Sequence, residues 1–471
     1  MRNVHSLLLT TALLLCGTCA AQEKTGQLPP PAPGAESPHG VIGISDAQLS
    51  PDFWVQRLEH PDRVVMAAAD IAMQNGKLLQ RDDSVHDLRA FPERINRKTL
   101  VASITSMSSL PDRPLYDVEG TPVPPETLQL LLQSLALEAV PDEGPTRYGL
   151  VLKRTALRNF PTQLRVFSTR GETDIDRFQE SALFPGAPVA IQHESKDGQW
   201  LWVTSPNYQA WVSKQDVALG SRAEVLEHAE KAPYRIVTGA KITTVFTREQ
   251  PPLSELQLDM GVRVPLATVA SDAPVNGQHP YSSWIIQLPV RNAKGELAFA
   301  PALLQKNQET SAEYLPLTHA NIIRQAFKFL GERYGWGHSY NGRDCSGFVS
   351  EVYRSMGVEM PRNTRDQSIS PALNHVTFDA GDSAEARKAA VDALQVGDLI
   401  YIPGHVMMMI GRIDGAPYVI HDTNGGSYLD ANGKMRAMQL NAVAVTPLLP
   451  LRFNPTQTYV DRITSIVRIR P

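Results

Sequence analysis

Three residues of this sequence could together form a thiol-based catalytic centre: Cys345, His405 and His421. Cys345 follows a loop rich in glycine and aromatic residues and precedes apolar residues at helical spacing, which places it at the start of a predicted helix. The free backbone N–H groups of a helix N-terminus favour a thiolate over a thiol and can stabilise an oxyanion. A thiolate nucleophile also needs a base, which a third group orients.

The two histidines lie on consecutive predicted strands, joined by a turn at Asp414-Gly415. A two-residue turn would place His421 opposite Met408, and the two imidazoles would then point to opposite faces of the sheet. A turn with an odd number of residues, with Gly415 at a bulge, puts both imidazoles on one face. Because catalysis by this pair needs a shared face, we expect the odd turn.

Cysteine is scarce, with 3 in 471 residues, and two of these lie in the leader. A basic start, a short apolar run and small residues before Gln22 are typical of a secretory signal peptide, so we expect export to the periplasm or the exterior and removal of residues 1–21. Cys16 and Cys19 leave with the leader, and Cys345 remains alone. The formal net charge of −4 argues against nucleic-acid binding. The leader's apolar run is too short for a membrane span.

The remaining chain divides by its patterns into five segments. Residues 22–40 form a Pro-rich linker, and residues 41–147 show helical periodicity. The periodicity includes an apolar stripe of Val64, Val65, Ala68 and Ile71 and a helix that starts at Pro124-Pro125. Residues 148–220 and 232–305 contain short alternating strands between turns, with a hairpin at Asp197-Gly198, which predicts two diverged β-barrels of one type. Residues 316–471 begin with a helix capped by Thr318 and continue into strands, so we expect an α+β domain with helices segregated from an antiparallel sheet.

Four strings around the candidate residues resemble the NlpC-type cell-wall cysteine peptidases: Asp344-Cys345-Ser346-Gly347, Tyr334-Gly335-Trp336-Gly337, Gly397-Asp398-Leu399 and Gly404-His405-Val406. The resemblance implies a papain-like catalytic domain. The wider layout is similar to the multi-module members of this family, which carry an N-terminal helical clip and two bacterial SH3-like barrels. The resemblance thus covers most of the mature chain.

The resemblance also implies an activity and roles for individual residues. Such proteins cleave γ-D-glutamyl–diamino acid bonds in peptidoglycan peptides, with Cys345 as nucleophile, His405 as base and His421 as orienter. In multi-module relatives, the Asp and Ser that flank the nucleophile and an upstream Tyr bind the free amine of an N-terminal L-Ala. Carried over by motif, these are Asp344, Ser346 and Tyr334. The first barrel of such relatives also contributes an aromatic residue to the substrate cleft, for which Tyr208 is the candidate here. The alternatives are that Asp344 only caps its helix and that Tyr208 only packs in its barrel.

Other interpretations stay open at this point. The family often has Gly-Gly after the tryptophan, whereas His338 stands here and could narrow the cleft or touch substrate. A zinc site made by His338, His405 and His421 lacks the usual ligand spacing, and we expect no metal or other cofactor. A transferase with the same thiol chemistry and a catalytically idle wall-binding protein are the two alternative functions. Residues 363–396 are expected to form a solvated loop or a lid. The sequence leaves the oligomeric state open.

Overall fold

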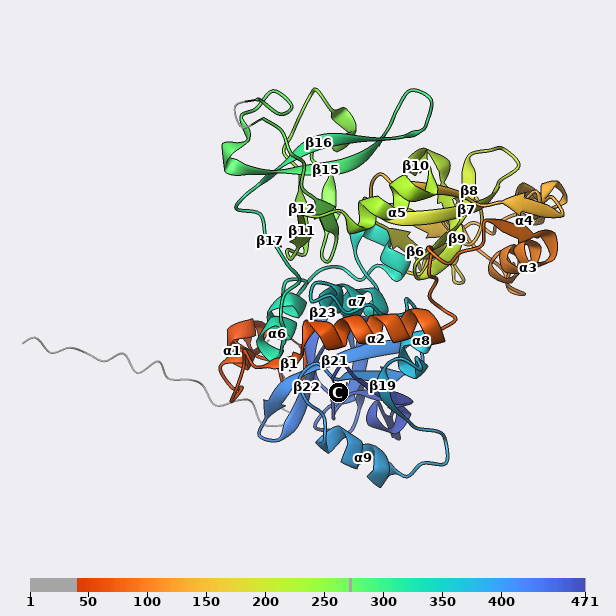
Figure 1. Ribbon diagram of the computed structural model, residues 1–471. Helices are drawn as coiled ribbons and strands as arrows, with labels where there is room; N and C mark the ends of the chain where they lie inside the picture. The colour runs from red at the N-terminus through yellow and green to blue at the C-terminus, as the bar shows by residue number, and fades with distance from the viewer. Residues whose placement is uncertain (1–39, 271–272, 471) are drawn as a thin grey trace, which may run out of the picture.

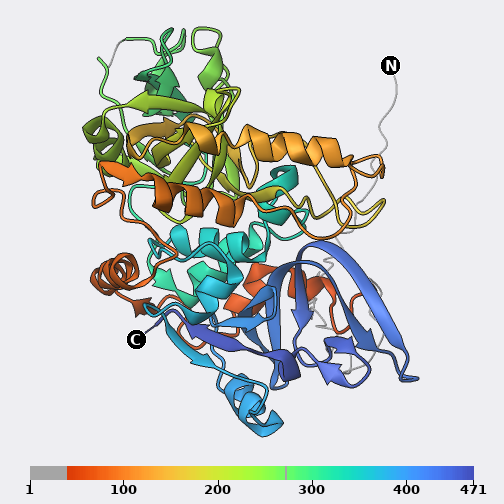
Figure 2. The same cartoon turned by 90° about the vertical axis from the view of Figure 1, so that its right-hand side faces the viewer.

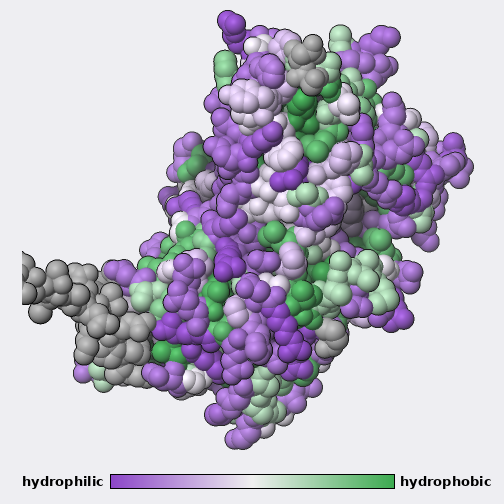
Figure 3. All heavy atoms as spheres, turned by 60° about the vertical axis from the view of Figure 1, so that its left-hand side comes forward, coloured by the Kyte–Doolittle hydropathy of each residue, from purple (hydrophilic) through white to green (hydrophobic). Residues whose placement is uncertain are grey.

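The computed structural model describes residues 40–270 and 273–470. The expected signal peptide, residues 1–21, and almost all of the expected linker lie outside the described residues. Within the described ranges, no helix is long and apolar enough to cross a membrane. Figure 1 shows two β-rich bodies above a third, C-terminal body, and Figure 3 shows that one face of the molecule is largely hydrophilic, with apolar residues in small scattered groups.

The C-terminal body is built on an eight-stranded antiparallel sheet. The strand order is β19-β26-β20-β21-β22-β24-β25, with β23 also paired to β22. The bounds of these strands are β19 Asn374–Thr377, β20 Leu399–Ile402, β21 His405–Ile413, β22 Ala416–Leu429, β23 Met435–Pro447, β24 Arg452–Asn454, β25 Gln457–Thr458 and β26 Ser465–Arg468.

Alternation along the strands assigns the two faces of this sheet. Val406, Met408 and Ile410 pack against α6 (His319–Phe327) and α7 (Cys345–Arg354) in one core. Met407 and Met409 face a second core that contains residues of α9 (Ala384–Asp392) and the segment after it. The helices therefore cover an antiparallel sheet as expected, and Thr318 caps α6 by accepting from the backbone N–H of Asn321.

Residues 363–396 do not form a solvated loop. They contain α8 (Thr364–Ile369), β19 and α9, and β19 pairs with β26 at the edge of the sheet. The expectation failed because small and acidic residues dominate this segment, and a short exposed strand and helix leave little apolar periodicity in the sequence.

The first β body is a seven-stranded sheet in the order β10-β4-β7-β8-β9-β5-β6. The hairpin predicted around Asp197-Gly198 is present as the antiparallel pair β7 and β8. The strand bounds are β4 Arg147–Val151, β5 Thr155–Arg158, β6 Gln179–Leu183, β7 Pro188–Glu194, β8 Trp200–Ser205, β9 Tyr208–Ser213 and β10 Val217–Gly220.

The second β body follows α5 (Arg222–Glu230) and has its own apolar core. Its longest pair is the β15–β16 hairpin, with all nine residues of each strand in register. The strand bounds are β11 Tyr234–Val237, β12 Lys241–Thr243, β13 Gln257–Asp259, β14 Arg263–Pro265, β15 Ser283–Arg291, β16 Leu297–Gln305 and β17 Thr310–Ser311.

The N-terminal segment packs on two different bodies (Figure 2). Its first part joins the C-terminal core through Trp54 and Ile71, and its second part joins the tryptophans of the first β body through Leu100 and Ile104. The elements are η1 Asp46–Leu49, α1 Pro51–Val55, β1 Val64–Met66, α2 Ala68–Arg81, β2 Arg94–Asn96, α3 Arg97–Met107, α4 Pro125–Ser134 and β3 Glu143–Pro145.

The helix predicted from the apolar residues that begin at Val64 starts later in the chain than expected. Val64 and Val65 belong to β1, which pairs with β18 (Leu317–Thr318) just before α6, and the helix begins only at Ala68. The pairing partner lies about 250 residues further along the sequence, so local periodicity carried no sign of it. The helix predicted after Pro124-Pro125 is present as α4, with Pro125 in its first turn.

Candidate active site

Cys345 is the first residue of α7 and is 5 % exposed. The helix starts there because the Asp344 carboxylate accepts the backbone N–H of Gly347 at 2.8 Å. Apolar Phe348, Val349 and Val352 then face the core. The predicted position of the thiol at a helix N-terminus is therefore confirmed.

The strand register places the two histidines on one face, by a route other than the predicted one. The turn at Asp414-Gly415 has two residues, and Ile413 pairs with Ala416, so the expected odd turn was wrong. A bulge between Met409 and Gly411 inserts one extra residue into β21, and Met408 then pairs with Ile420 instead of His421. The bulge restores the register that the turn does not supply.

The imidazoles of His405 and His421 are in direct contact. His405 Nε2 lies 2.8 Å from His421 Nδ1, and His421 Nε2 lies 3.0 Å from the Thr446 hydroxyl. The remaining ring nitrogen of His405 is Nδ1. The backbone N–H of Val406, the next residue, hydrogen-bonds the Cys345 thiol, which brings the nucleophile to the start of β21. Sequence reasoning missed Thr446, on β23, because only the β22–β23 pairing brings its hydroxyl to His421.

Burial keeps the thiol and the imidazoles neutral. Burial and the neighbouring Asp344 carboxylate raise the pKa of Cys345 to about 12, and burial lowers the pKa of His405 to about 4. The pKa of His421 also falls well below its usual value, through burial and then His405. The resting centre is thus a thiol beside an imidazole, and not the ion pair that the helix N-terminus alone predicts.

The four residues expected to bind substrate lie in one neighbourhood, around Asp344 and Arg362. Tyr208 reaches it from β9 of the first β body, and its hydroxyl donates to Glu180 Oε2 on β6 at 2.6 Å. Burial and then Glu180 raise the pKa of Tyr208, and burial and then Cys345 raise the pKa of Tyr334. The Asp344 carboxylate raises both pKa values further, so it lies within electrostatic range of both phenols. Ser346 donates to Asp344 at 3.2 Å. Glu180 is an additional carboxylate that sequence reasoning missed.

Comparison with family models identifies two segments of the chain. Residues 331–445 match the NlpC/P60 family, and residues 165–213 match an SH3 domain of the SH3b1 type. The chain carries an NlpC/P60 domain. This family of peptidoglycan hydrolases is the one that the motifs around Cys345 indicated.

Individual proteins agree with this assignment. The chain is 26% identical over 267 residues to a dipeptidyl-peptidase 6 of Lysinibacillus sphaericus, covering 55% of this chain and 86% of that protein. It is 26% identical over 262 residues to a γ-D-glutamyl-L-lysine dipeptidyl-peptidase of Bacillus cereus, covering 51% and 66%. An NlpC/P60 endopeptidase from Photobacterium damselae has the same fold, with a TM-score of 0.66 at 16% identity over 84% of this chain and 90% of that one.

In the NlpC/P60 domain, Asp344 is paired with a buried arginine, Arg362. Arg362 Nη1 and Nη2 donate to the two Asp344 oxygens at 3.1 and 2.8 Å, and Nη1 also donates to Ser346 at 2.9 Å. Burial alone would raise the pKa of Asp344, but Arg362 and His338 lower it to about 2. Asp344 therefore caps its helix and also forms a buried ion pair with Arg362.

The depressed pKa of Asp344 predicts how its contribution to stability depends on pH. Because the folded-state pKa lies below the ordinary value of 3.8, the contribution is complete above about pH 4 and is lost as pH falls toward 2. Asp344→Asn, which keeps a capping side chain, should lower the unfolding temperature at pH 7. The gap between variant and wild type should narrow from pH 4 to pH 2.5 in calorimetry. A gap that is constant over this interval would contradict the assignment.

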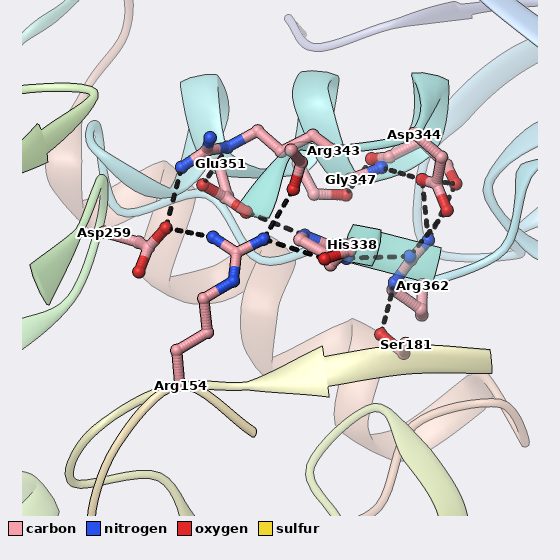
Figure 4. Close-up of polar contacts among 12 residues, drawn as sticks. Arg154, Ser181, Asp259, His338, Arg343, Asp344, Gly347, Glu351 and Arg362 are labelled. Atoms are coloured by element: carbon pink, nitrogen blue, oxygen red, sulfur yellow. Dashed lines mark hydrogen bonds and ion pairs between the residues drawn. The ribbon is translucent and has the colours of Figure 1, made fainter. Parts of the chain in front are cut away.

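A buried polar network extends from this pair toward the second β body (Figure 4). His338 contacts Glu351 on α7, and Glu351 accepts from Arg343 Nε at 2.6 Å. Arg343 is 0% exposed and donates to Asp259 on β13 at 3.0 Å. Arg154, which precedes β5, donates to the same carboxylate. Since these residues converge only in the folded chain, nothing in the local sequence indicated the network.

Asp422 is the residue after His421 and is 0% exposed. Neither of its carboxylate oxygens has a hydrogen-bond partner among the described residues. Burial, reinforced by Asp344 and Glu332, raises its pKa well above the usual value, so the side chain is a neutral acid. No sequence signal separated this aspartate from an ordinary strand residue.

Proposed function

We propose that this protein hydrolyses the γ-D-glutamyl–diamino acid bond of peptidoglycan stem peptides through a Cys345–His405–His421 centre. The observation that carries the proposal is the 2.8 Å contact between the two imidazoles, at the strand end that faces the thiol. A relative named as a γ-D-glutamyl-L-lysine dipeptidyl-peptidase supports the choice of bond. The proposal includes export, a second SH3-like barrel at residues 232–305, and the helical clip at residues 41–147.

The first half of the reaction starts from the neutral thiol of Cys345 and the neutral imidazole of His405. As Sγ of Cys345 attacks the γ-carbonyl carbon of D-glutamate, the thiol proton moves to Nδ1 of His405. The tetrahedral oxyanion lies near the N-terminus of α7, where backbone N–H groups are free. The C–N bond then breaks, the leaving amine takes the proton from His405, and a thioester remains.

Water completes the cycle. His405 removes a proton from a water molecule, which attacks the thioester carbonyl, and the thiol recovers its proton as the γ-carboxylate leaves. Throughout the reaction, Nδ1 of His421 contacts Nε2 of His405, and the Thr446 hydroxyl contacts Nε2 of His421. This chain of contacts fixes which nitrogen of His405 faces the thiol.

The proposal also includes a preference for a free N-terminal L-Ala. Asp344 and Glu180 supply two carboxylates, and Arg362 supplies one buried cation next to Asp344. Two carboxylates and one guanidinium together carry a net charge of −1, which complements the positive charge of an ammonium group. Removal of water from around these groups strengthens the attraction between them. Burial raises the pKa of Glu180, and a neighbouring ammonium group would favour its ionised form.

Glu180→Gln tests this preference. The variant keeps an oxygen that can accept from Tyr208 and loses the charge, so we expect kcat/KM for a stem peptide with free L-Ala to fall about 10- to 100-fold. The same peptide acylated at its N-terminus should react slowly with wild type and at an unchanged rate with the variant. Glu194→Gln, a half-buried carboxylate elsewhere on the first β body, is the control. Equal rates for free and acylated peptides in wild type would remove the amine preference.

A further inference from the structure

His338 is a buried residue in a backbone conformation that favours glycine. It is 6 % exposed and has φ of 66° in the short helix η6 (Trp336–Asn341). A side chain other than glycine is strained in this left-handed region. Residues held in such conformations occur where the surroundings fix them. The contacts of the imidazole show what fixes this one.

Both ring nitrogens of His338 are engaged by charged groups. Nδ1 lies 3.0 Å from Arg362 Nη2, and Nε2 lies 2.9 Å from Glu351 Oε1. A guanidinium can only donate and an ionised carboxylate can only accept, so Nδ1 is the acceptor and Nε2 carries the hydrogen. His338 is therefore a neutral imidazole in one defined tautomer, between a cation and an anion (Figure 4).

Arg362 has no donor left for a substrate. Its five N–H groups point to Ser181 at 2.7 Å, to Ser346, to both Asp344 oxygens and to His338. Its function is thus to hold Asp344 in place. Ser181, on β6 of the first β body, and His338 fix the two ends of the guanidinium.

Glu351, the other partner of His338, is anchored from the opposite side. Arg343 donates to Glu351 and to Asp259, so the contacts continue into the second β body. The main chain of His338 is held as well, because its carbonyl accepts from Arg154 at 3.1 Å. His338 is consequently the link between the Arg343 network and the Arg362–Asp344 pair.

We propose that His338 is a positioning residue for substrate specificity: it fixes Arg362 so that Asp344 presents its charge to the free amine of the substrate. This inference rests on the proposed function, since it concerns the residues that are proposed there to bind the free amine of the substrate. It predicts that loss of the His338 side chain affects the binding of only one of two related ligands. Loss of the imidazole weakens binding of a ligand with a free N-terminal amine and leaves the binding of its acylated counterpart unchanged.

The experiment measures binding of the dipeptide L-Ala-γ-D-Glu and of its N-acetyl derivative by calorimetry, in the Cys345→Ala background. His338→Gly is the main variant, because glycine adopts the positive φ without strain and removes only the side chain. His338→Gln keeps one acceptor and one donor. Asn341→Gly is the matched control: Asn341 has φ of 56° in the same loop and bonds Gln257 of the second β body, not Arg362.

We expect His338→Gly to weaken binding of the free dipeptide about tenfold, the loss of one hydrogen bond to a charged group. His338→Gln should recover part of this loss, Asn341→Gly should match the parent, and N-acetyl binding should not change. Unchanged binding of the free dipeptide, or equal weakening of both ligands, overturns the inference. Turnover is measured separately in the Cys345 enzyme. If that enzyme cleaves no γ-D-glutamyl bond while His338 still controls dipeptide binding, the proposed reaction fails and the inference about His338 stands.

Discussion

Cys345→Ala is expected to lower the turnover of stem peptides by more than about 10⁴-fold, because the thioester pathway cannot begin without the thiol. Mass spectrometry of purified muropeptides after incubation with the mature protein measures the loss. Cys345 is buried in the main core of the C-terminal body, but alanine removes a single sulfur atom there. The variant should therefore unfold at nearly the wild-type temperature.

This variant also separates the proposed hydrolase from its alternatives. An idle wall-binding protein predicts no turnover by wild type and no difference between the two proteins. A transferase predicts loss in the variant as well, but wild type should then form an amide product when a competing amine is present. Retained turnover in a purified Cys345→Ala sample would remove Cys345 as the nucleophile.

His421→Ala is expected to lower kcat/KM by about 10³- to 10⁴-fold, since the loss of an orienting group leaves the base in the wrong tautomer and free to rotate. The structure gives the reason in two contacts: His421 holds His405 Nε2 at 2.8 Å and is itself held by Thr446 at 3.0 Å. His421→Gln, which can still hydrogen-bond His405, should recover part of the activity.

Thr446→Val is the graded control for this prediction. It removes the outer contact and preserves the shape of the side chain, so we expect a loss of about tenfold or less. A His421→Ala enzyme with near wild-type kcat/KM would contradict the proposed role. A Thr446 effect larger than that of His421 would contradict the order of the contacts.

Local sequence signals predicted the nucleophile and its helix. Asp344 and the apolar spacing after it mark the start of α7, and Thr318 marks the start of α6 in the same way. These features depend on residues within one or two turns. The antiparallel sheet and the hairpin at Asp197-Gly198 are likewise encoded by short alternating patterns.

The shared face of the two histidines could not be derived from the turn. It depends on the bulge beside Gly411, and Trp54 packs directly against this glycine. A Cβ at position 411 would lie 2.7 Å from the Trp54 ring. The partner is more than 350 residues away in the sequence, beyond the reach of any pattern read along a single strand.

The buried charged residues around the site could not be predicted from the sequence, for a similar reason. Arg343 is completely buried, a rare state for a charged side chain, and its partners Glu332, Glu351 and Asp259 come from separate elements. Each of these residues is of a charged type that usually lies on the protein surface. Only their convergence, together with Glu180 and Arg362, shows how charge is distributed around the thiol.

The contact of Trp54 with β21 has a consequence for the order in which the chain is made. The segment that carries Trp54 and β1 is synthesised well before its partners β18 and Gly411. While the chain is being made, these N-terminal residues lack the partners against which they pack in the folded protein. Closure of this long loop is therefore a late folding event.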